Sequence, residues 1–288
     1  MAEYVLPIEV TNMIDDKFKI RYKFVPVAVS ESIGSNPTRL HNHDEFEILL
    51  INSGSSSVYI ANKEYKVSTG DMVFINPMEI HEVIPDNATT YAHQCICCDL
   101  SIVMHGQSCG NISNECSGIV PIVKGSTLHG IQLSELFKKA FDAFKRDEKT
   151  AAMEVCAYIT LLFSYLLKNS LVDAHRTNNK ETEFCSNVID YIKKHYVENI
   201  TSKQVADACF LNHSYFCRKF KENFGVKFSS YLNIHRISEA RKMFEENVET
   251  ITDISVRCGF ATPAYFSRCF KEFVGVSPQE YKKCKRSL

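Results

Sequence analysis

The sequence predicts a multi-domain protein of mixed class, in which an N-terminal antiparallel β-barrel with added helices precedes an all-helical C-terminal domain. Three observations support this prediction. The 288 residues suffice for two domains of ordinary size. Short apolar stretches separated by turn residues occupy positions 22–98. From about Gln132 the apolar residues instead recur with a helical period, which continues almost to the C-terminus.

The β-rich part is recognised by its strands and turns. Apolar stretches such as EFEILLI, SVYIA, YKVS and DMVFI alternate with the turn clusters NSGSSS, ANKE, STGD and NPME. Several short strands at this spacing, with Gly and Pro at the turns, favour a barrel or a sandwich. Residues 1–125 are therefore predicted to form this domain.

The helical region begins with LSELFKKAFDAFKRDEK, which places its apolar residues on one face. A second helix, roughly residues 150–168, is apolar over most of its surface and needs two covers, such as the barrel and a second subunit. Residues 126–170 are therefore predicted to support a homodimer, with Leu162 and Leu166 as exposed members of the interface. The polar stretch 171–183 is the predicted linker to a helical domain at 184–288.

Charge and cysteine content limit the function classes. Residues 184–288 carry 17 Lys and Arg against 11 Asp and Glu, whereas residues 1–183 carry 16 against 23. This difference suggests a polyanion partner for the C-terminal part alone. The twelve cysteines follow no regular framework, so we expect free thiols in a reducing compartment. For Cys95, Cys97 and Cys98, with His93 nearby, strand packing is favoured over a metal or redox role.

The ends and apolar runs of the chain predict a cytoplasmic protein without a membrane partner. The first residues, MAEYVLPIEV, lack the basic and apolar regions of a secretory signal. The longest apolar run, at 157–167, is too short to span a bilayer.

The clearest motif is a repeat. HSYFCRKFKENFG at 213–225 returns as PAYFSRCFKEFVG at 263–275, and the alignment pairs Phe210 with Phe260. A short predicted helix precedes each copy, so each unit is expected to be helix, turn, helix. Asn212 and Thr262 are predicted N-caps of the second helices, and Pro263 suits a first helical position.

The spacing inside each copy separates a buried face from an outward face. Phe216 and Phe220 lie four residues apart and are predicted to face a core, as are Phe266 and Phe270. The opposite face carries small polar residues and an arginine, which fits a recognition helix in the DNA major groove. An ordinary helical bundle with a solvated basic face is the alternative, and the duplication of the pattern disfavours it.

Residues 184–288 resemble the DNA-binding domain of the AraC/XylS family of transcriptional regulators. The resemblance runs through both units, the connecting helix with YLNIHRISEARKMF, and the run CGFATPAYFSRCFKEFVGVSPQEY. It implies double-stranded DNA as a partner, with RNA polymerase as a further partner of an activator. The residues it implies at bases are His213, Ser214, Cys217, Arg218, Pro263, Ala264, Ser267 and Arg268. Lys221 and Lys271 are predicted to contact phosphates.

A second motif lies in the β-rich part. HNHDEFEILLINSG at 41–54 and GDMVFINPMEIH at 70–81 resemble the cupin barrel, which the same family commonly carries as its effector-binding domain. His41, His43 and Glu47 share parity along an extended chain, and His81 follows a turn. Three imidazoles and a carboxylate suit a divalent transition metal. Binding of an organic effector, hydrogen bonding within the barrel, and a metal site all stay open.

These motifs together predict a sequence-specific transcriptional regulator that is controlled by a small-molecule effector in the N-terminal barrel, and not an enzyme. The effector is expected to shift the placement of the DNA-binding domains through the linker. The alternative is a metal-dependent cupin sensor or enzyme fused to a DNA-binding domain. The sequence lacks P-loop, GxSxG and GxGxxG motifs, so it gives no support for nucleotide or serine-hydrolase chemistry.

Overall fold

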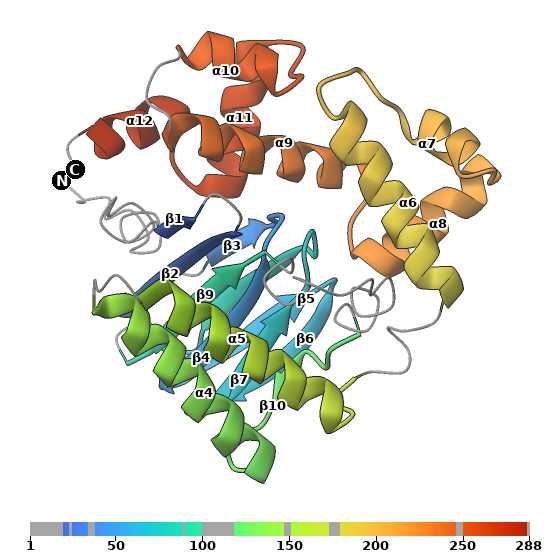
Figure 1. The fold of residues 1–288 in the computed structure, drawn as a ribbon. Coiled ribbons are helices and arrows are strands. Elements are labelled where there is room, and N and C mark those ends of the chain that lie inside the picture. The colour runs from blue at the N-terminus through green and yellow to red at the C-terminus, as the bar shows by residue number, and fades with distance from the viewer. Residues whose placement is uncertain are drawn as a thin grey trace.

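A computed structural model describes residues 20–22, 25–33, 38–87, 90–99, 118–146, 151–172, 179–245 and 250–286. The N-terminal part is built from strands, followed by two long helices (Figure 1). The strands are β1 (Ile20–Tyr22), β2 (Val25–Ile33), β3 (Thr38–His41), β4 (Phe46–Ser53), β5 (Ser55–Ile60), β6 (Lys63–Ser68), β7 (Met72–Ile75), β8 (His81–Pro85), β9 (Ala92–Cys98) and β10 (Ile122–Val123).

The strands form two antiparallel sheets, as the β-rich prediction requires. One sheet has the order β1-β2-β9-β4-β7-β10 and the other β3-β8-β5-β6. Alternate residues of β4 point in opposite directions because a strand has a period of two. Leu49 and Ile51 enter the core between the sheets, whereas Ile48 and Leu50 pack toward the helices. Residues on β4 therefore reach two different cores.

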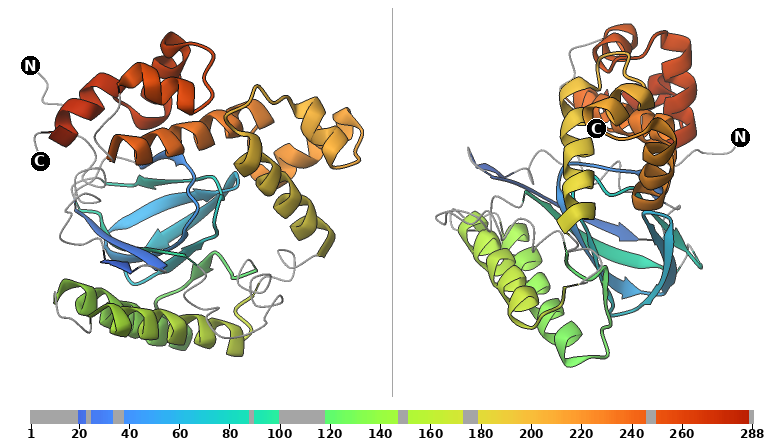
Figure 2. Two further views of the ribbon diagram at one scale, coloured as in Figure 1. Left: turned by 45° about the horizontal axis from the view of Figure 1, so that its top comes forward. Right: turned by 90° about the vertical axis from the view of Figure 1, so that its right-hand side faces the viewer.

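Helices α4 (Leu128–Lys145) and α5 (Ala151–Lys168) lie side by side across the outer face of the larger sheet (Figures 1 and 2). Their inward residues include Phe137, Phe141 and Phe163. Leu162 and Leu166 are 1 % and 0 % exposed in this core. The prediction that these two leucines are exposed is wrong, because the apolar stripe of α5 is centred on them and faces the sheet.

The C-terminal domain is all-helical, as predicted. Its helices are α6 (Asn179–His195), α7 (Ser202–Ala208), α8 (His213–Phe224), α9 (Phe228–Glu245), α10 (Ile251–Arg257), α11 (Pro263–Val274) and α12 (Pro278–Arg286). Helix α6 begins inside the segment 171–183 that was predicted as the linker. The stretch NKETEF consists largely of residues that are tolerated in a helix, and its apolar side chain Phe184 is buried in the domain core.

Helices α7–α8 and α10–α11 form two helix-turn-helix units, called unit 1 and unit 2. Thr201 and Thr250 begin the first helices with capping boxes. Asn212 and Thr262 cap the second helices through their side chains, and Pro263 is the first residue of α11, so these three predictions are confirmed.

The turns of the two units differ by one residue. Phe210 has a positive φ of 55° and is 97 % exposed, whereas Phe260 is 4 % exposed. In unit 1 the amide of Leu211 donates to Ala206, and in unit 2 the amide of Phe260 makes the corresponding bond to Ser255. Phe210 therefore occupies the place of Gly259, and the predicted pairing of Phe210 with Phe260 is wrong. The longer turn of unit 2 causes the shift.

The C-terminal helices lie over the sandwich on the side away from α4 and α5 (Figure 2). The core of unit 1 includes Met78 and Ile80 from the loop before β8, so the two domains share apolar packing. The core of unit 2 is formed by helices α9–α12 and by residues of the turns that follow α10 and α11.

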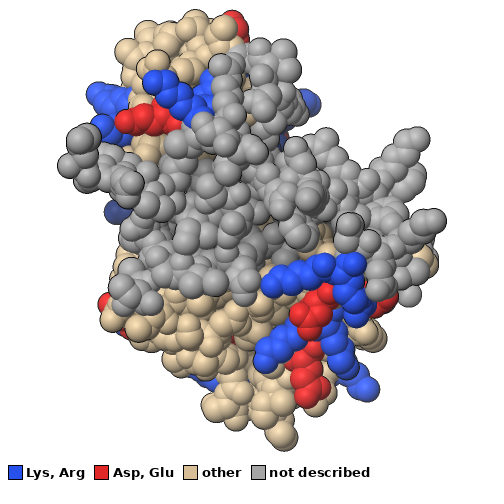
Figure 3. All heavy atoms as spheres, turned by 90° about the vertical axis from the view of Figure 1, so that its left-hand side faces the viewer, with Lys and Arg blue, Asp and Glu red and all other residues tan. Residues whose placement is uncertain are grey.

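The described part of the chain contains no helix that is long and apolar enough to cross a membrane. On the face drawn in Figure 3, Lys and Arg side chains lie among Asp and Glu side chains around the ends of α4 and α5. That part of the surface therefore lacks the uniform positive charge expected of a nucleic-acid footprint.

Candidate functional site

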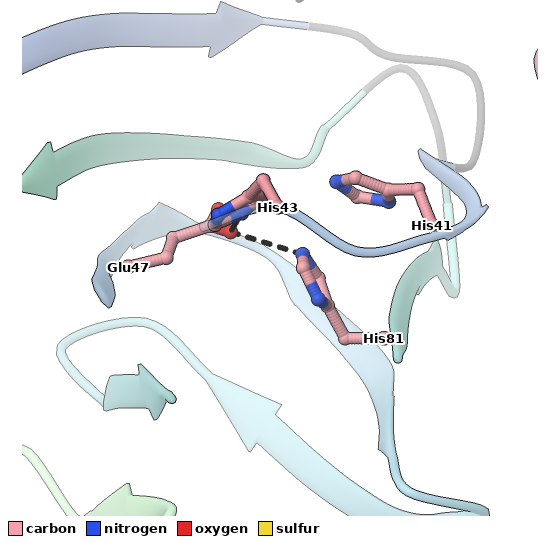
Figure 4. A group of neighbouring side chains, drawn as sticks. All are labelled: His41, His43, Glu47 and His81. Atoms are coloured by element: carbon pink, nitrogen blue, oxygen red, sulfur yellow. Dashed lines mark hydrogen bonds and ion pairs between the residues drawn. The ribbon is translucent and has the colours of Figure 1, made fainter. Parts of the chain in front are cut away.

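The four predicted ligand residues of the N-terminal domain come together in one cluster, His41, His43, Glu47 and His81, named the His–Glu cluster (Figure 4). His41 ends β3, His81 begins β8, and Glu47 lies near the start of β4. A turn at residues 42–45 brings His43 back toward Glu47, so the convergence does not come from one extended strand as the parity argument assumed.

Glu47 is the centre of the cluster. The Nε2 atom of His43 lies 2.8 Å from Glu47 Oε2, and the Nε2 atom of His81 lies 3.0 Å from the same oxygen. The ring of His41 lies against that of His81, with centroids 4.1 Å apart. The other ring nitrogen of each histidine faces a backbone carbonyl: His41 Nδ1 that of Arg39, His43 Nδ1 that of Glu45, and His81 Nδ1 that of Glu79. These contacts fix the ring orientations.

The residues of the His–Glu cluster shift one another's pKa values in different directions. Burial alone would raise the pKa of Glu47, but the charge of His81 and the hydrogen bond from His43 hold that pKa well below its usual range. Burial lowers the pKa of His81, and the carboxylate of Glu47 more than compensates, so the pKa of His81 is raised. Burial and the neighbouring imidazoles lower the pKa of His41. The cluster therefore holds an ionised carboxylate and a neutral imidazole at His41.

The donor set fits a transition-metal ion. One nitrogen from each histidine and one oxygen of Glu47 all lie within 4.8 Å of one another. Neutral imidazole and carboxylate are ligands of Zn²⁺ and similar ions. Three histidines and a carboxylate can equally bind an organic ligand that carries hydroxyl or acidic groups.

Two cysteines lie on the other side of Glu47. Cys95 Sγ is 3.3 Å from Glu47 Oε1 and 3.5 Å from Cys97 Sγ. Both thiols enter the core between the sheets, whereas Cys98 points to the helix-covered core. The predicted packing role fits Cys98, while Cys95 and Cys97 also make polar contacts that the sequence did not indicate.

The turn that carries His43 also contacts the C-terminal domain. Ser238 Oγ on α9 donates to the Asn42 carbonyl at 2.6 Å. Lys193 and Lys242 reach the Asp44 carboxylate at 2.7 and 2.6 Å. Burial alone would raise the pKa of Asp44, but the two ammonium groups hold it well below its usual range. These five residues are called the domain contact. No sequence pattern indicated them, because the two sides of the contact lie about 150–200 positions apart in the chain.

The predicted DNA-contacting side chains form the outer faces of α8 and α11. His213, Ser214, Cys217, Arg218, Lys221, Pro263, Ala264, Arg268 and Lys271 are exposed, and Ser267 is partly buried. Phe216, Phe220, Phe266 and Phe270 are fully buried behind them. Arg218 and Arg268 each lie over the ring of the tyrosine three residues earlier, at 5.5 and 5.0 Å. The two units thus present their arginines in the same way.

The start of α8 differs from that of α11 in its polar contacts. His213 Nε2 lies 2.8 Å from Ser202 Oγ and 3.4 Å from Cys217 Sγ. Pro263 takes the position of His213 in α11 and offers no side-chain donor. The first unit therefore has more hydrogen-bonding groups at its helix start than the second.

Comparisons with known proteins give results for both domains. Residues 33–163 match a family described as an AraC-like ligand binding domain, and residues 205–283 match a helix-turn-helix domain. The chain is 25 % identical over 257 residues to the uncharacterised HTH-type transcriptional regulator YdeC of Bacillus subtilis (strain 168), covering 85 % of this chain and 86 % of that protein. It is 23 % identical over 269 residues to the HTH-type transcriptional activator RhaS of Enterobacter sp. (strain 638), covering 90 % and 92 %.

Solved structures share the fold. ToxT from Vibrio cholerae O395 superposes with a TM-score of 0.60 at 16 % identity, covering 93 % of this chain and all of that one (100 %). Wild-type ToxT from V. cholerae strain SCE256, bound to an unsaturated fatty acid, gives a TM-score of 0.58 at 18 % identity and covers 90 % and 94 %. The order of a β-rich domain followed by two helix-turn-helix units is therefore an arrangement found in other proteins.

Proposed function

Because this chain belongs to the AraC/XylS family of transcriptional regulators, we propose that it binds its operator through the outward faces of α8 and α11 and responds to a ligand at the His–Glu cluster. The observation that carries the DNA-binding assignment is the shared design of the two units. Each exposes an arginine and a lysine one turn apart on a helix whose phenylalanines are buried.

In this proposal the residues of each helix have separate roles. Arg218 and Arg268 reach base edges, where a guanidinium can pair with guanine through two hydrogen bonds. Lys221 and Lys271 neutralise phosphates. His213, Ser214, Cys217, Pro263, Ala264 and Ser267 line the surfaces that face the bases. Cys217 and Ala264 supply little or no hydrogen bonding, so the arginines carry most of the discrimination.

The ligand site is proposed at the His–Glu cluster because it gathers buried and partly buried polar groups that a core alone does not require. A fatty acid is the ligand named for ToxT, but here the cluster offers imidazoles and a carboxylate, which favours a polar ligand or a divalent transition metal. When bound, a metal ion would supply a fixed positive charge beside Glu47. His41, His43, His81 and Glu47 are the residues that would hold it.

Ligand binding is proposed to reach the DNA-binding domain through the domain contact. Residues 41–44 alternate in role: His41 and His43 belong to the cluster, while Asn42 and Asp44 bind α6 and α9. A ligand that moves His43 by rotation of the backbone also moves Asp44. This route replaces the linker as the main path of control, because it connects the two sites through four consecutive residues.

The protein is proposed to act as a cytoplasmic homodimer, with RNA polymerase as a further partner if it activates transcription. The outer face of α5 exposes Met153 and Leu161, which are 72 % and 53 % accessible and two turns apart. A second copy of the chain is the proposed cover. Leu161→Glu should give monomers without unfolding, and a parent protein that is already monomeric would refute this.

Operator binding is tested by titrating the full chain with a DNA site selected from a random library. The Arg218→Ala/Arg268→Ala double variant should lose preference for that site over unrelated DNA. Lys138→Ala/Lys139→Ala, which removes two positive charges from the exposed face of α4, is the matched control and should bind as the parent does. Unchanged preference in the double variant would contradict the assignment.

The route of control is tested with Asp44→Asn and His43→Ala. Asp44→Asn removes the charge that Lys193 and Lys242 share, so DNA affinity without ligand should change several-fold. His43→Ala should abolish the ligand response but leave DNA binding measurable. Glu64→Gln, which breaks an ion pair with Lys66 on the far sheet, is the control for lost charge. Equal effects of Asp44→Asn and Glu64→Gln would exclude this route.

An enzymatic role for the β-domain is the alternative that the His–Glu cluster keeps open. The relatives named above are transcriptional regulators, which supports regulation without catalysis. A screen of the metal-loaded protein against cupin-type oxygenase and isomerase substrates would reveal turnover if the alternative holds.

A further inference from the structure

We infer that Cys95 and Cys97 are ligands, together with Glu47, of a thiophilic metal ion, so that the ligand site of this protein has a sulfur side as well as a histidine side. The inference rests on the proposed ligand role of the His–Glu cluster and names the chemical class of its ligand. It assigns a binding role to two thiols that the DNA-binding function does not use.

The backbone register places the three residues together. Cys97 lies directly opposite Glu47 in the β4–β9 pair, and Cys95 lies opposite Leu49. Residues i and i+2 of a strand point to the same face, so both thiols and the carboxylate enter the space between the two sheets. All three residues are at most 9 % exposed. Two rigid central strands therefore hold the donors, and bulk water is largely excluded.

The spacing of the donors is close to that of a tetrahedral ligand set. Metal–sulfur bonds of about 2.3 Å and metal–oxygen bonds of about 2.0–2.2 Å place tetrahedral ligands roughly 3.4–3.8 Å apart. The distances are 3.5 Å between the two sulfur atoms and 3.3 Å between Cys95 Sγ and Glu47 Oε1. One oxygen of Glu47 and both sulfur atoms lie within 4.8 Å of one another, so the three donors can converge on one ion after a small movement of their side chains.

Glu47 connects the two sides. Its Oε1 atom faces Cys95, while its Oε2 atom faces His43 and His81. A carboxylate with both oxygens committed in this way can ligate on the sulfur side while it keeps the imidazoles oriented. Each thiol gives up its proton to solvent when its sulfur binds the ion, so metal binding releases protons.

The donor types predict the selectivity. Thiolate sulfur selects Zn²⁺, Co²⁺ and similar ions over Mg²⁺, Ca²⁺ and Mn²⁺, which prefer oxygen ligands. A site made only of His41, His43, His81 and Glu47 would lack this sulfur contribution. The spectrum of the bound ion therefore distinguishes the two compositions of the site.

The test is a Co²⁺ titration of the full chain after removal of metals by a chelator, under reducing, oxygen-free conditions. Thiolate ligation gives an intense near-ultraviolet charge-transfer band that imidazole and carboxylate ligands do not give. The parent should develop this band with about one equivalent of Co²⁺. Zn²⁺ should abolish the band, and a hundredfold excess of Mg²⁺ should not.

Three single variants identify the cysteines that give rise to the charge-transfer band. Cys95→Ala and Cys97→Ala should each weaken Co²⁺ binding at least tenfold and reduce the band to about half or less. Cys98→Ala is the matched control, because this neighbouring thiol points into the other core, and it should titrate as the parent does. Circular dichroism of each apo variant verifies folding, and the Zn²⁺ and Mg²⁺ competition on the parent needs no variant.

The outcomes separate this inference from the proposed function. Tight Co²⁺ binding without the sulfur band, unchanged in Cys95→Ala and Cys97→Ala, would overturn the thiol ligands and leave the His–Glu cluster as the metal site. A band that persists in the Cys95→Ala/Cys97→Ala double variant would place it on other cysteines and also overturn the inference. No binding of Co²⁺ by the parent would overturn both metal assignments, while operator binding would still stand on its own test.

Discussion

Unit 1 and unit 2 present the same outward pattern on different supports. Phe216 and Phe220 of unit 1 pack in a core that also takes in Met78 and Ile80 of the β-domain. Phe266 and Phe270 of unit 2 pack in a core formed by helices α9–α12 and by residues of the turns that follow α10 and α11. A ligand-induced change in the β-domain should therefore reach unit 1 through its apolar core. It should reach unit 2 through α9, which both units share, and through Arg39 of β3, which donates to the Glu272 carbonyl of α11 at 3.2 Å. The difference makes unit 1 the half of the DNA-binding domain whose core the β-domain enters.

The largest expected effect comes from truncating the matched phenylalanines. Phe220→Ala and Phe270→Ala should each lower the free energy of unfolding by roughly 3–5 kcal/mol, because each leaves a cavity in a packed core. Phe220 also contacts the ring of Tyr231, whose hydroxyl donates to the Met78 carbonyl at 2.9 Å. Phe220→Ala should therefore also speed hydrogen exchange at residues 76–80, and Phe270→Ala should not. Urea denaturation and hydrogen exchange check both parts, and equal exchange in the two variants would contradict the asymmetry.

The next largest expected effect is a loss of stability on substitution of Gly259 in the turn of unit 2. Gly259 has a φ of 77°, and a Cβ there would lie 2.5 Å from the Val197 carbonyl oxygen and 2.7 Å from that of Tyr196. Gly259→Ala should therefore cost more than the roughly 1–2 kcal/mol of left-handed backbone alone. Gly70→Ala is the control, because Gly70 has a φ of 89° but its nearest neighbour would be 3.7 Å away. Thermal melts of both variants separate the cost of this steric clash from that of the left-handed backbone. Equal losses of stability in the two variants would show that the clash is absent.

The next expected effect is on operator affinity, where the arginines of the two units can be compared. Arg218→Ala and Arg268→Ala should each weaken operator binding by roughly 1–3 kcal/mol and relax preference at a different part of the site. Lys221→Ala should weaken binding to all sequences and reduce the salt slope by about one. Titrations on matched and mutated sites at several salt concentrations check this. Loss of preference at the same base pairs in both arginine variants would show that the helices do not read separate segments.

The features predicted correctly from the sequence depend on residues close together in the chain. The features that were missed depend on contacts between residues far apart in the chain. The caps Asn212 and Thr262 and the buried Phe216 and Phe220 depend on neighbours within one turn, so spacing alone revealed them. The exposure of Leu162 was wrongly predicted, because a helix that is apolar nearly all round does not show which stripe faces the sheet.

Tertiary position explains the other omissions. The ion pairs of Asp44 with Lys193 and Lys242 join residues far apart in the chain. The approach of Cys95 to Glu47 depends on the β4–β9 register, which a single sequence does not encode visibly. The His–Glu cluster was predicted because its two motifs resemble those of the cupin barrel and its residue types suit a metal. A turn, and not a continuous strand, brings these residues into contact.

The smallest expected effect concerns Phe210, which takes in unit 1 the place that Gly259 takes in unit 2. A left-handed conformation costs a non-glycine residue roughly 1–2 kcal/mol. Glycine avoids this cost but loses roughly 0.5–1 kcal/mol through its freer unfolded chain. Because the Phe210 side chain is 97 % exposed, little packing is lost on its removal. Phe210→Gly should therefore stabilise the domain by roughly 0.5–1 kcal/mol.

Phe210→Ala keeps the left-handed strain and serves as the control, with stability close to that of the parent. Urea denaturation of both variants checks the prediction, and a loss of stability in Phe210→Gly would show that the turn does not carry this strain. Operator titrations of the same two variants show whether the exposed ring of Phe210 takes part in DNA binding. Weaker binding in both, despite the gain in stability of Phe210→Gly, would assign the exposed ring a role in binding, because strain persists in a protein where function requires the strained residue.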